Sequence, residues 1–134
     1  GGTINDNWEP ALSRDGRRVA FTTSRDNDWE IYAMNSDGGD EIRLTNSPGK
    51  DAAPAWSPDG QRIAFSSERA GNADRPKVWV MNADGSDPRP LTTGDSIDVY
   101  PAWSPDGKQM AFASNRSGRL DIWVMSADGS SLRK

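Results

Sequence analysis

Hydrophobic residues fall in short runs along the chain, and turn-forming residues separate the runs. Within each run, consecutive positions are apolar, which is typical of strands covered on both faces rather than on one. No stretch of ten or more residues repeats its apolar positions with the helical period of 3.6. The pattern therefore predicts an all-β protein. The runs alternate along the chain between two kinds. Runs of the first kind lie at residues 19–21, 63–65 and 110–112, and runs of the second kind lie at residues 31–34, 78–81 and 122–125.

The runs belong to an internal repeat. The sequence PAWSPDG occupies residues 54–60 and again 101–107, and a divergent copy, PALSRDG, occupies residues 10–16. Each copy is followed by one run of each kind and by an Asp-Gly pair. Fixed spacing of this kind indicates repeated structural units, so the chain contains three.

Each unit predicts four strands. The first carries Pro-Ala-Trp, and Ser-Pro-Asp-Gly then forms a tight turn, with Pro and Gly at positions that suit them. The third strand is rich in branched and aromatic residues, and a second turn at Asp-Gly leads to the fourth, which ends in Leu-Thr. The second strands are expected at residues 18–24, 62–68 and 109–115.

Four-stranded antiparallel units of this length, covered on both faces, are the blades of a β-propeller. We expect residues 1–134 to form one three-bladed half-propeller. The blades are predicted at about 8–45, 52–92 and 99–134.

The stretches PAWSPDGQRIAFSSERAG and VWVMNADGSDPRPLT resemble the TolB-like propeller repeat, found in the carboxyl-terminal domain of TolB and in many exported bacterial proteins. The resemblance covers the whole chain. It implies a six-bladed ring, a role in binding envelope proteins, and a periplasmic or extracellular location. The first unit departs from the pattern at Leu12 and Arg14, where the others have Trp and Pro, and the second inserts three residues around 72–76.

Three blades cannot close a ring, so each outer blade would expose an apolar face. We therefore predict a C2 homodimer in which two half-rings make one six-bladed ring. A nine-bladed trimer and an excised fragment of a longer protein are the alternatives. By the repeat alignment Lys134 matches Arg43 and Gly1 matches Thr45, so the chain has almost a whole number of units, which favours the half-ring. The chain begins without Met, so a processed form or a fragment is expected.

Composition excludes several classes of function. The net charge is −4, with 16 basic residues scattered among 20 acidic ones, so no basic stripe predicts nucleic-acid binding. No apolar run is long enough to insert into a membrane. The chain has no Cys and no His, which removes Ser-His-Asp and Cys-His catalysis and His-based metal sites. We predict that it is not an enzyme, although a pair of carboxylates could still act as acid and base.

A polar residue lies three positions before the Pro of each unit, at Asn7, Asp51 and Asp98. If the first strand is innermost, these side chains gather at one mouth of the central channel. Like charges gathered in this way either raise the pKa values of the aspartates or attract a cation, and the hypothesis is that the mouth binds Ca²⁺, Mg²⁺ or a cationic side chain of a partner. The alternative is that they are solvated loop residues, with no cofactor.

Aromatic residues lie beside this set, at Trp8 and Tyr100, with Glu9 and Val99 next to them. Aromatic side chains next to carboxylates on a loop face are typical of surfaces that recognise proteins.

An arginine recurs at the end of each second strand, at Arg25, Arg69 and Arg116. Glu30 and Asp121 follow five residues later in the first and third units, which predicts an ion pair joining the second and third strands of each blade. The second unit has Lys77 at the acidic position, so Asp74 is a candidate substitute. A ligand-binding role for these arginines is the alternative.

Together these features predict a non-catalytic scaffold for protein–protein interaction. The alternative is a propeller that binds a metal or small ligand at the channel mouth. In that case the chain would be a fragment of a larger exported protein or hydrolase.

Overall fold

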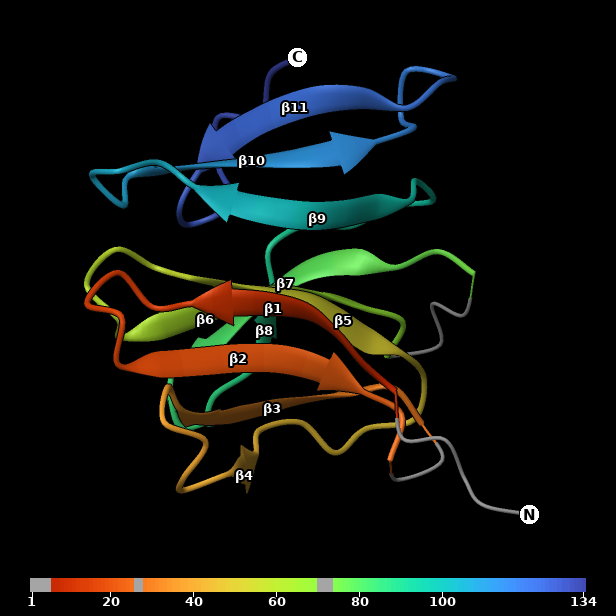
Figure 1. Ribbon diagram of the computed structural model, residues 1–134. Helices are drawn as coiled ribbons and strands as arrows, with labels where there is room; N and C mark the ends of the chain where they lie inside the picture. Colours follow the sequence, from red (N-terminus) through yellow and green to blue (C-terminus); the bar gives the residue numbers. More distant parts are fainter. Residues whose placement is uncertain (1–5, 26–27, 70–73) are drawn as a thin grey trace.

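The computed structural model describes residues 6–25, 28–69 and 74–134, and within them the chain forms eleven strands and no helix. The strands make three antiparallel sheets stacked face to face (Figure 1). The first sheet has the order β1 (Asn7–Leu12), β2 (Arg18–Thr23), β3 (Glu30–Asn35) and β4 (Ile42–Arg43). All-β structure is thus confirmed.

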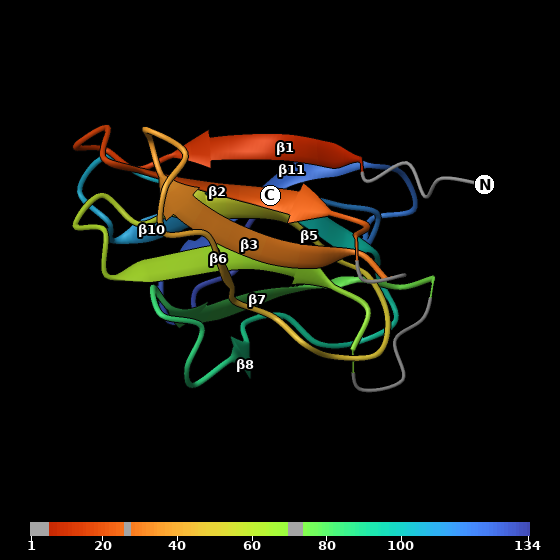
Figure 2. The same ribbon diagram turned by 60° about the horizontal axis from the view of Figure 1, so that its bottom comes forward.

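The second sheet repeats this order with β5 (Asp51–Trp56), β6 (Arg62–Ser67), β7 (Lys77–Asn82) and β8 (Arg89–Pro90). In the turned view β6, β7 and β8 follow one another outward (Figure 2). The third sheet contains β9 (Asp98–Trp103), β10 (Gln109–Ser114) and β11 (Asp121–Ser126). Its fourth strand is reduced to one bridge between Val124 and Arg133.

The Ser-Pro-Asp-Gly turn is held by its own side chains. In the second sheet Ser57 Oγ donates to Asp59 Oδ1 at 2.6 Å, and Gln61 N donates to the same oxygen at 3.0 Å. Arg62 N donates to Ser57 Oγ at 3.0 Å, which closes the hairpin. The Ser57 hydroxyl and the Gln61 N–H together lower the pKa of Asp59. The equivalent contacts recur in the first and third sheets.

Each innermost strand contains a β-bulge that the sequence pattern did not predict. Glu9, Ala53 and Tyr100 have φ values of 52°, 55° and 58°, and the strand register shifts at each of them. The bulge turns the peptide toward the preceding sheet. As a result Ala53 N donates to Thr22 Oγ1 at 3.2 Å and Tyr100 N to Ser66 Oγ at 3.1 Å.

The core lies between the sheets. Ile31 and Ala33 of β3 belong to one buried cluster with Ile63, Phe65 and Met81 of the second sheet. A second buried cluster joins the second and third sheets in the same way, through Ala64, Val78, Met110, Phe112 and Met125. Small and branched side chains on one sheet thus meet large ones on the next. This packing confirms that the strands are covered on both faces inside the stack.

Tryptophans tie neighbouring sheets together. Trp56 Nε1 donates to Ala11 O at 2.9 Å, and Trp103 Nε1 donates to Ala55 O at 3.0 Å. The innermost strands β1, β5 and β9 therefore follow one another with a constant offset, as the blades of a propeller do. In the described part of the chain no helix has the length and hydropathy needed to cross a membrane.

Candidate functional site

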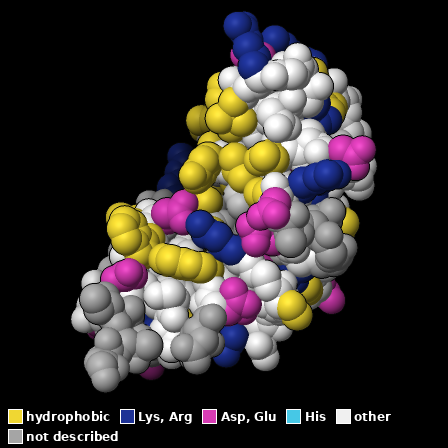
Figure 3. Space-filling model, turned by 90° about the vertical axis from the view of Figure 1, so that its right-hand side faces the viewer, with side chains coloured by type: hydrophobic (Ala, Val, Ile, Leu, Met, Phe, Trp, Pro, Cys, Tyr) yellow, Lys and Arg dark blue, Asp and Glu magenta, His cyan; other side chains and the backbone are white. Residues whose placement is uncertain are grey.

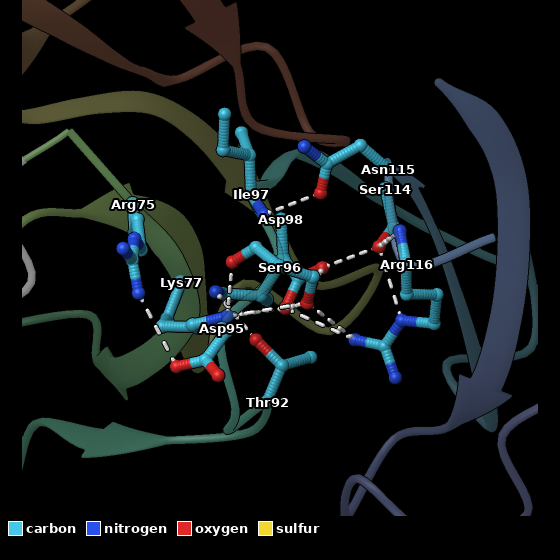
Figure 4. Close-up of polar contacts among 11 residues, drawn as sticks. Arg75, Lys77, Thr92, Asp95, Ser96, Ile97, Asp98, Ser114, Asn115 and Arg116 are labelled. Atoms are coloured by element: carbon cyan, nitrogen blue, oxygen red, sulfur yellow. Dashed lines mark hydrogen bonds and ion pairs between the residues drawn. The ribbon is translucent and has the colours of Figure 1, made fainter. Parts of the chain in front are cut away.

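The clearest polar cluster surrounds Asp98, at the start of β9 (Figure 4). This carboxylate is fully buried, and its Oδ2 lies 3.0 Å from Arg116 Nη2 and 3.3 Å from Lys77 Nζ. Its Oδ1 accepts from Ser114 Oγ at 2.6 Å and from Ser96 Oγ at 3.0 Å. Burial acts to raise the pKa of Asp98, but the hydrogen bonds from Ser114 and Arg116 outweigh it and the pKa is lowered.

Asp51 occupies the same place at the start of β5. It is also fully buried, and Arg69 Nη2 lies 3.0 Å from its Oδ2. Ser47 Oγ donates to Oδ2 at 2.7 Å, and Ser67 Oγ donates to Oδ1. Two of the three blades therefore contain one Asp–Arg–Ser cluster with the same geometry.

These clusters correct the predicted place of the two aspartates. Asp51 and Asp98 do not face the channel mouth, because each side chain points into its own blade toward an arginine. The predicted rise of the pKa by repulsion is also wrong for Asp98. Of the three repeated polar residues only Asn7, the equivalent in β1, is exposed. Its Oδ1 lies 3.5 Å from Arg25 Nη2.

The predicted partners of the arginines are wrong as well. Arg116 pairs with Asp98 rather than Asp121, and Arg69 pairs with Asp51 rather than with Asp74. Strand β10 lies between β9 and β11, and Ser114 is paired with Asp98 on one side and with Asp121 on the other. Ser114 Oγ donates to Asp98 Oδ1 and accepts from Arg116 Nε, which holds the guanidinium on the side of Asp98. Each guanidinium also stacks over aromatic rings of its own blade, Phe65 and Trp79 for Arg69 at 5.2 and 5.0 Å.

In the first blade, Arg25 pairs with Glu41 and not with Glu30. Glu30 is instead buried in the junction to the second blade, where it accepts from Thr45 Oγ1 and from Ser47 N. Burial, helped by the nearby charge of Asp51, raises the pKa of Glu30. The related position in the third blade, Asp121, lies 2.8 Å from Lys134 Nζ and 3.3 Å from Arg119 Nε.

A second candidate site is the surface at the ends of the innermost strands, which we call the mouth surface and define by Trp8, Glu9, Lys50, Glu68, Val99 and Tyr100. A pocket is lined by the last five of these residues. Trp8 precedes Glu9 in the sequence and lines a second groove, with Val19, Phe21 and Met34. Trp8 is 55% and Tyr100 62% exposed. Hydrophobic, basic and acidic side chains lie side by side on the face of the molecule seen in Figure 3.

The sequence had indicated Trp8 and Tyr100, and the structure places both on an exposed surface. Lys50 and Glu68 were missed. Lys50 N donates to Glu68 Oε2 at 3.3 Å across the start of β5 and the end of β6. Their only sequence signal was that each lies next to a repeated polar residue, Asp51 or Arg69.

The TolB beta propeller domain model matches residues 3–75 and 72–134, which together include nearly the whole chain. The chain belongs to the TolB beta-propeller domain family. The resemblance of the repeats to TolB-like blades is therefore confirmed, as is the propeller arrangement of the three sheets.

Relatives of this TolB-family chain include the Tol-Pal system protein TolB of Anaeromyxobacter dehalogenans, strain 2CP-C, which is 40% identical over 117 residues. That match covers 87% of this chain and 26% of the relative. The uncharacterized peptidase YuxL of Bacillus subtilis is 41% identical over 56 residues, 41% of this chain and 8% of the relative. The chain thus spans about a quarter or less of the curated relatives it matches.

Among solved structures, the putative TolB from Agrobacterium tumefaciens has a TM-score of 0.85 and 28% identity, over 96% of this chain and 48% of that one. TolB from Acinetobacter baumannii has a TM-score of 0.81 and 27% identity, over 93% and 31%. The three blades therefore keep the spacing and tilt of blades in larger TolB propellers.

The TolB-family blades of this chain offer little for metal binding. Among residues 6–25, 28–69 and 74–134, no group of three or more His, Cys, Asp or Glu side chains could hold a metal ion. The two buried aspartates already have cationic partners within their blades. Their arrangement is suited to joining strands.

Proposed function

We propose that this TolB-family chain is a non-catalytic scaffold for protein–protein interaction, and that the mouth surface contacts the partner. The observation that carries the proposal is the exposure of Tyr100 beside Lys50 and Glu68 in one pocket, with Trp8 exposed next to Glu9, which lines the same pocket. Aromatic residues are enriched in protein interfaces, because they bury a large area with few rotatable bonds. The neighbouring charges supply a polar rim that gives orientation.

The kinds of titratable groups in the chain and the partners of its buried carboxylates support a non-catalytic role. The chain contains no His, and the buried carboxylates of Asp51 and Asp98 are bound by Arg69 and Arg116. A carboxylate held by a guanidinium is a poor general base, since its lone pairs are occupied, and the pKa of Asp98 is lowered as well.

The relatives suggest where such a scaffold would work. Several carry the name Tol-Pal system protein TolB, and we extend to this chain a place in the periplasm or outside the cell, among partner proteins of the envelope. The match to YuxL supports a second possibility, a propeller segment within a larger peptidase, which would also use the mouth surface to select what enters.

Peptide selection tests the proposal. A displayed library of random peptides is selected on the wild-type chain, and the affinities of recovered peptides are measured by biolayer interferometry. Trp8→Ser and Tyr100→Ser should each weaken binding at least about tenfold, as expected for aromatic hot spots. Ile42→Ser is the matched control, because Ile42 is 41% exposed on β4, away from the innermost strands.

Two outcomes would overturn the proposal. One is selected peptides whose binding is unaffected by both mouth variants. The other is hydrolysis of the peptides by the wild-type chain that Trp8→Ser and Tyr100→Ser reduce.

A further inference from the structure

Glu30 is a buried carboxyl group that the proposed function does not use. It begins β3 and is 1% exposed. In the second blade the same position is held by Lys77, whose Nζ lies 3.3 Å from Asp98 Oδ2 (Figure 4). At the junction of the first and second blades, the same two positions hold Glu30 and Asp51. A pair of carboxyl groups therefore stands where the next junction has an ion pair.

Ser47 joins the two carboxyl groups. Its backbone N–H donates to Glu30 Oε1 at 3.2 Å, and its hydroxyl donates to Asp51 Oδ2 at 2.7 Å. The other oxygen of Glu30 accepts a hydrogen bond from Thr45 Oγ1. One short segment between the blades thus holds the two carboxyl groups close together, and neither can move away without breaking these hydrogen bonds.

The charged groups around Glu30 act on it unequally. Arg43 of β4 lies 3.4 Å from it, Nη2 to Oε1, but the side chain of Arg43 is 33% exposed, so water screens its charge. The like charge of Asp51 is buried beside Glu30, and Arg69 Nη2 lies 3.0 Å from Asp51 Oδ2. Burial, helped by the charge of Asp51, raises the pKa of Glu30, so this group keeps a proton at pH values where an exposed glutamate has lost it.

Three contacts connect Glu30 to the mouth surface. Trp29, the residue before Glu30, accepts a hydrogen bond from Asp51 N at 2.8 Å through its carbonyl oxygen. Lys50 Nζ lies 5.2 Å from the centre of the Trp29 ring, and Lys50 N donates to Glu68 Oε2 at 3.3 Å. Lys50 and Glu68 both line the pocket of the mouth surface. The start of β5 therefore belongs both to the buried carboxyl pair and to the mouth surface.

We infer that loss of the Glu30 proton to solvent weakens partner binding at the mouth surface. While Glu30 is neutral, it and Asp51 lie together against Ser47, as in the structure. Once ionised, Glu30 repels Asp51, and the start of β5 moves so that Lys50 leaves Glu68. The partner therefore binds tightly at low pH and more weakly as the pH rises. This inference rests on the proposed function, because it concerns regulation of the same surface.

The next junction lacks the parts of this switch and so provides an internal control. There Lys77 and Asp98 attract each other in their charged forms. The hydrogen bond equivalent to that of Lys50 is donated by Ile97 N to Asn115 Oδ1 at 2.8 Å, and its acceptor is an amide, which does not titrate. The start of β9 should therefore keep its place over the pH range in which the start of β5 moves.

Peptide binding measured over a series of pH values tests the inference. The probes are selected peptides that depend on Trp8 and Tyr100 and that contain no Asp, Glu or His, so the peptide itself does not titrate. Their affinity for the wild-type chain should fall at least about fivefold between about pH 5 and about pH 8. Glu30→Gln keeps the shape of the side chain without its charge, and should bind with the same affinity throughout. Asp121→Asn is the matched control, because Asp121 holds the same position in the third blade but pairs with Lys134 and Arg119. It should behave as the wild type.

Amide NMR signals of the free chain give a readout that needs no peptide. The signals of Lys50 and Asp51 should move with pH in the wild-type chain and stay fixed in Glu30→Gln, whereas those of Ile97 and Asp98 should stay fixed in both. Circular dichroism melting at each pH verifies that Glu30→Gln is folded.

The outcomes separate this inference from the proposed function. Peptides that lose affinity in Trp8→Ser and Tyr100→Ser, but bind the wild-type chain equally at every pH, overturn the inference and leave the proposed function standing. The same holds if Glu30→Gln retains the pH dependence, or if the Lys50 signal does not move. Peptides that are indifferent to both mouth variants overturn the proposed function and the inference with it.

Discussion

Lys77 and Asp98 form an ion pair across the junction of the second and third blades, with Nζ 3.3 Å from Oδ2 and side chains only 3% and 0% exposed. At the matching place between the first and second blades, Glu30 lies near Asp51. Asp98 thus faces a cation in one junction, whereas its equivalent, Asp51, lies near another carboxylate in the other. The two junctions should therefore respond differently to mutation and to pH.

Asp98→Ala should lower the free energy of unfolding by about 3–5 kcal/mol, since it leaves the buried Lys77 and the partly buried Arg116 without their carboxylate. Asp95→Ala is the control, because Asp95 is 98% exposed in its pair with Arg75 and should cost less than about 1 kcal/mol. Urea unfolding followed by tryptophan fluorescence measures both. Equal effects of the two substitutions would show that the buried cluster adds no stability.

Glu30 should make the protein less stable as the pH rises. Burial raises the pKa of Glu30 above its ordinary value of 4.5, so the folded chain keeps a proton that the unfolded chain has released. The contribution of Glu30 to stability is therefore greatest below pH 4.5 and declines as the pH passes through the raised pKa. Glu30→Gln should remove this decline and leave the protein at least as stable as the wild type at neutral pH, as measured by urea unfolding at a series of pH values.

Asp98 should make the protein more stable as the pH rises, which is the opposite of the effect of Glu30 in the same urea-unfolding experiment. Its pKa is lowered below the ordinary 3.8, so its contribution is present at neutral pH and is lost as the pH falls through the lowered value. Asp98→Asn should flatten the acid side of the profile and leave the decline due to Glu30 in place. If either substitution altered both the acid side of the stability profile and the decline at higher pH, Glu30 and Asp98 would titrate as a coupled pair.

The repeat made most of the fold predictable. The second strands were expected at residues 18–24, 62–68 and 109–115, and each ends one residue earlier in the structure. Three aligned copies fix the register, because a side chain must face the same way in every blade. The bulges at Glu9, Ala53 and Tyr100 could not be predicted, since none of these residues is a glycine that would signal a positive φ.

The site was predicted less well, for a physical reason. Arg116 and Asp98 were both recognised as repeated polar residues, but the arginine was assigned to Asp121, only five residues away. In an antiparallel sheet, residues far apart in sequence are neighbours across strands, and Asp98 is 18 residues from Arg116. Sequence spacing therefore identified the right residues but could not choose between the flanking strands.

Comparing two tryptophans gives the contribution of the indole hydrogen bond to stability, apart from the contribution of the buried ring. Trp56 Nε1 donates to Ala11 O between blades, whereas the buried Trp79 Nε1 has no partner among the described residues. Both Trp→Phe changes remove a similar volume, so Trp56→Phe should cost about 1 kcal/mol more than Trp79→Phe. Thermal and urea unfolding give both values. A larger loss for Trp79→Phe would contradict the assignment of the interblade bond.

Calcium or magnesium should not stabilise the chain, because Asp51 and Asp98 are already held by Arg69 and Arg116. We expect no heat in a calorimetric titration with either ion, and no shift of the melting temperature between millimolar CaCl₂ and EDTA. Arg116→Gln serves as a comparison, since it frees one carboxylate oxygen. Saturable heat with the wild-type chain would restore the hypothesis of a cation site at the channel mouth.

Gly85 should tolerate alanine much less well than Gly38, although both occupy the same position of the same turn. Their φ values are +87° and +90°, so Ala pays a similar backbone cost of about 1–2 kcal/mol at either site. A Cβ at Gly85 would lie 2.5 Å from the carbonyl oxygen of Leu44 in the preceding blade, whereas none of the described atoms lies within 4 Å of one at Gly38. Pushing two blades apart should add about 1–3 kcal/mol.

Urea unfolding of Gly85→Ala and Gly38→Ala gives the difference directly, because the shared backbone cost cancels. The extra loss at Gly85 then measures how far blade-to-blade contact stabilises the stack. If the two variants unfold at the same urea concentration, the blades can separate at that turn without penalty, and the close approach of Leu44 contributes nothing to the fold.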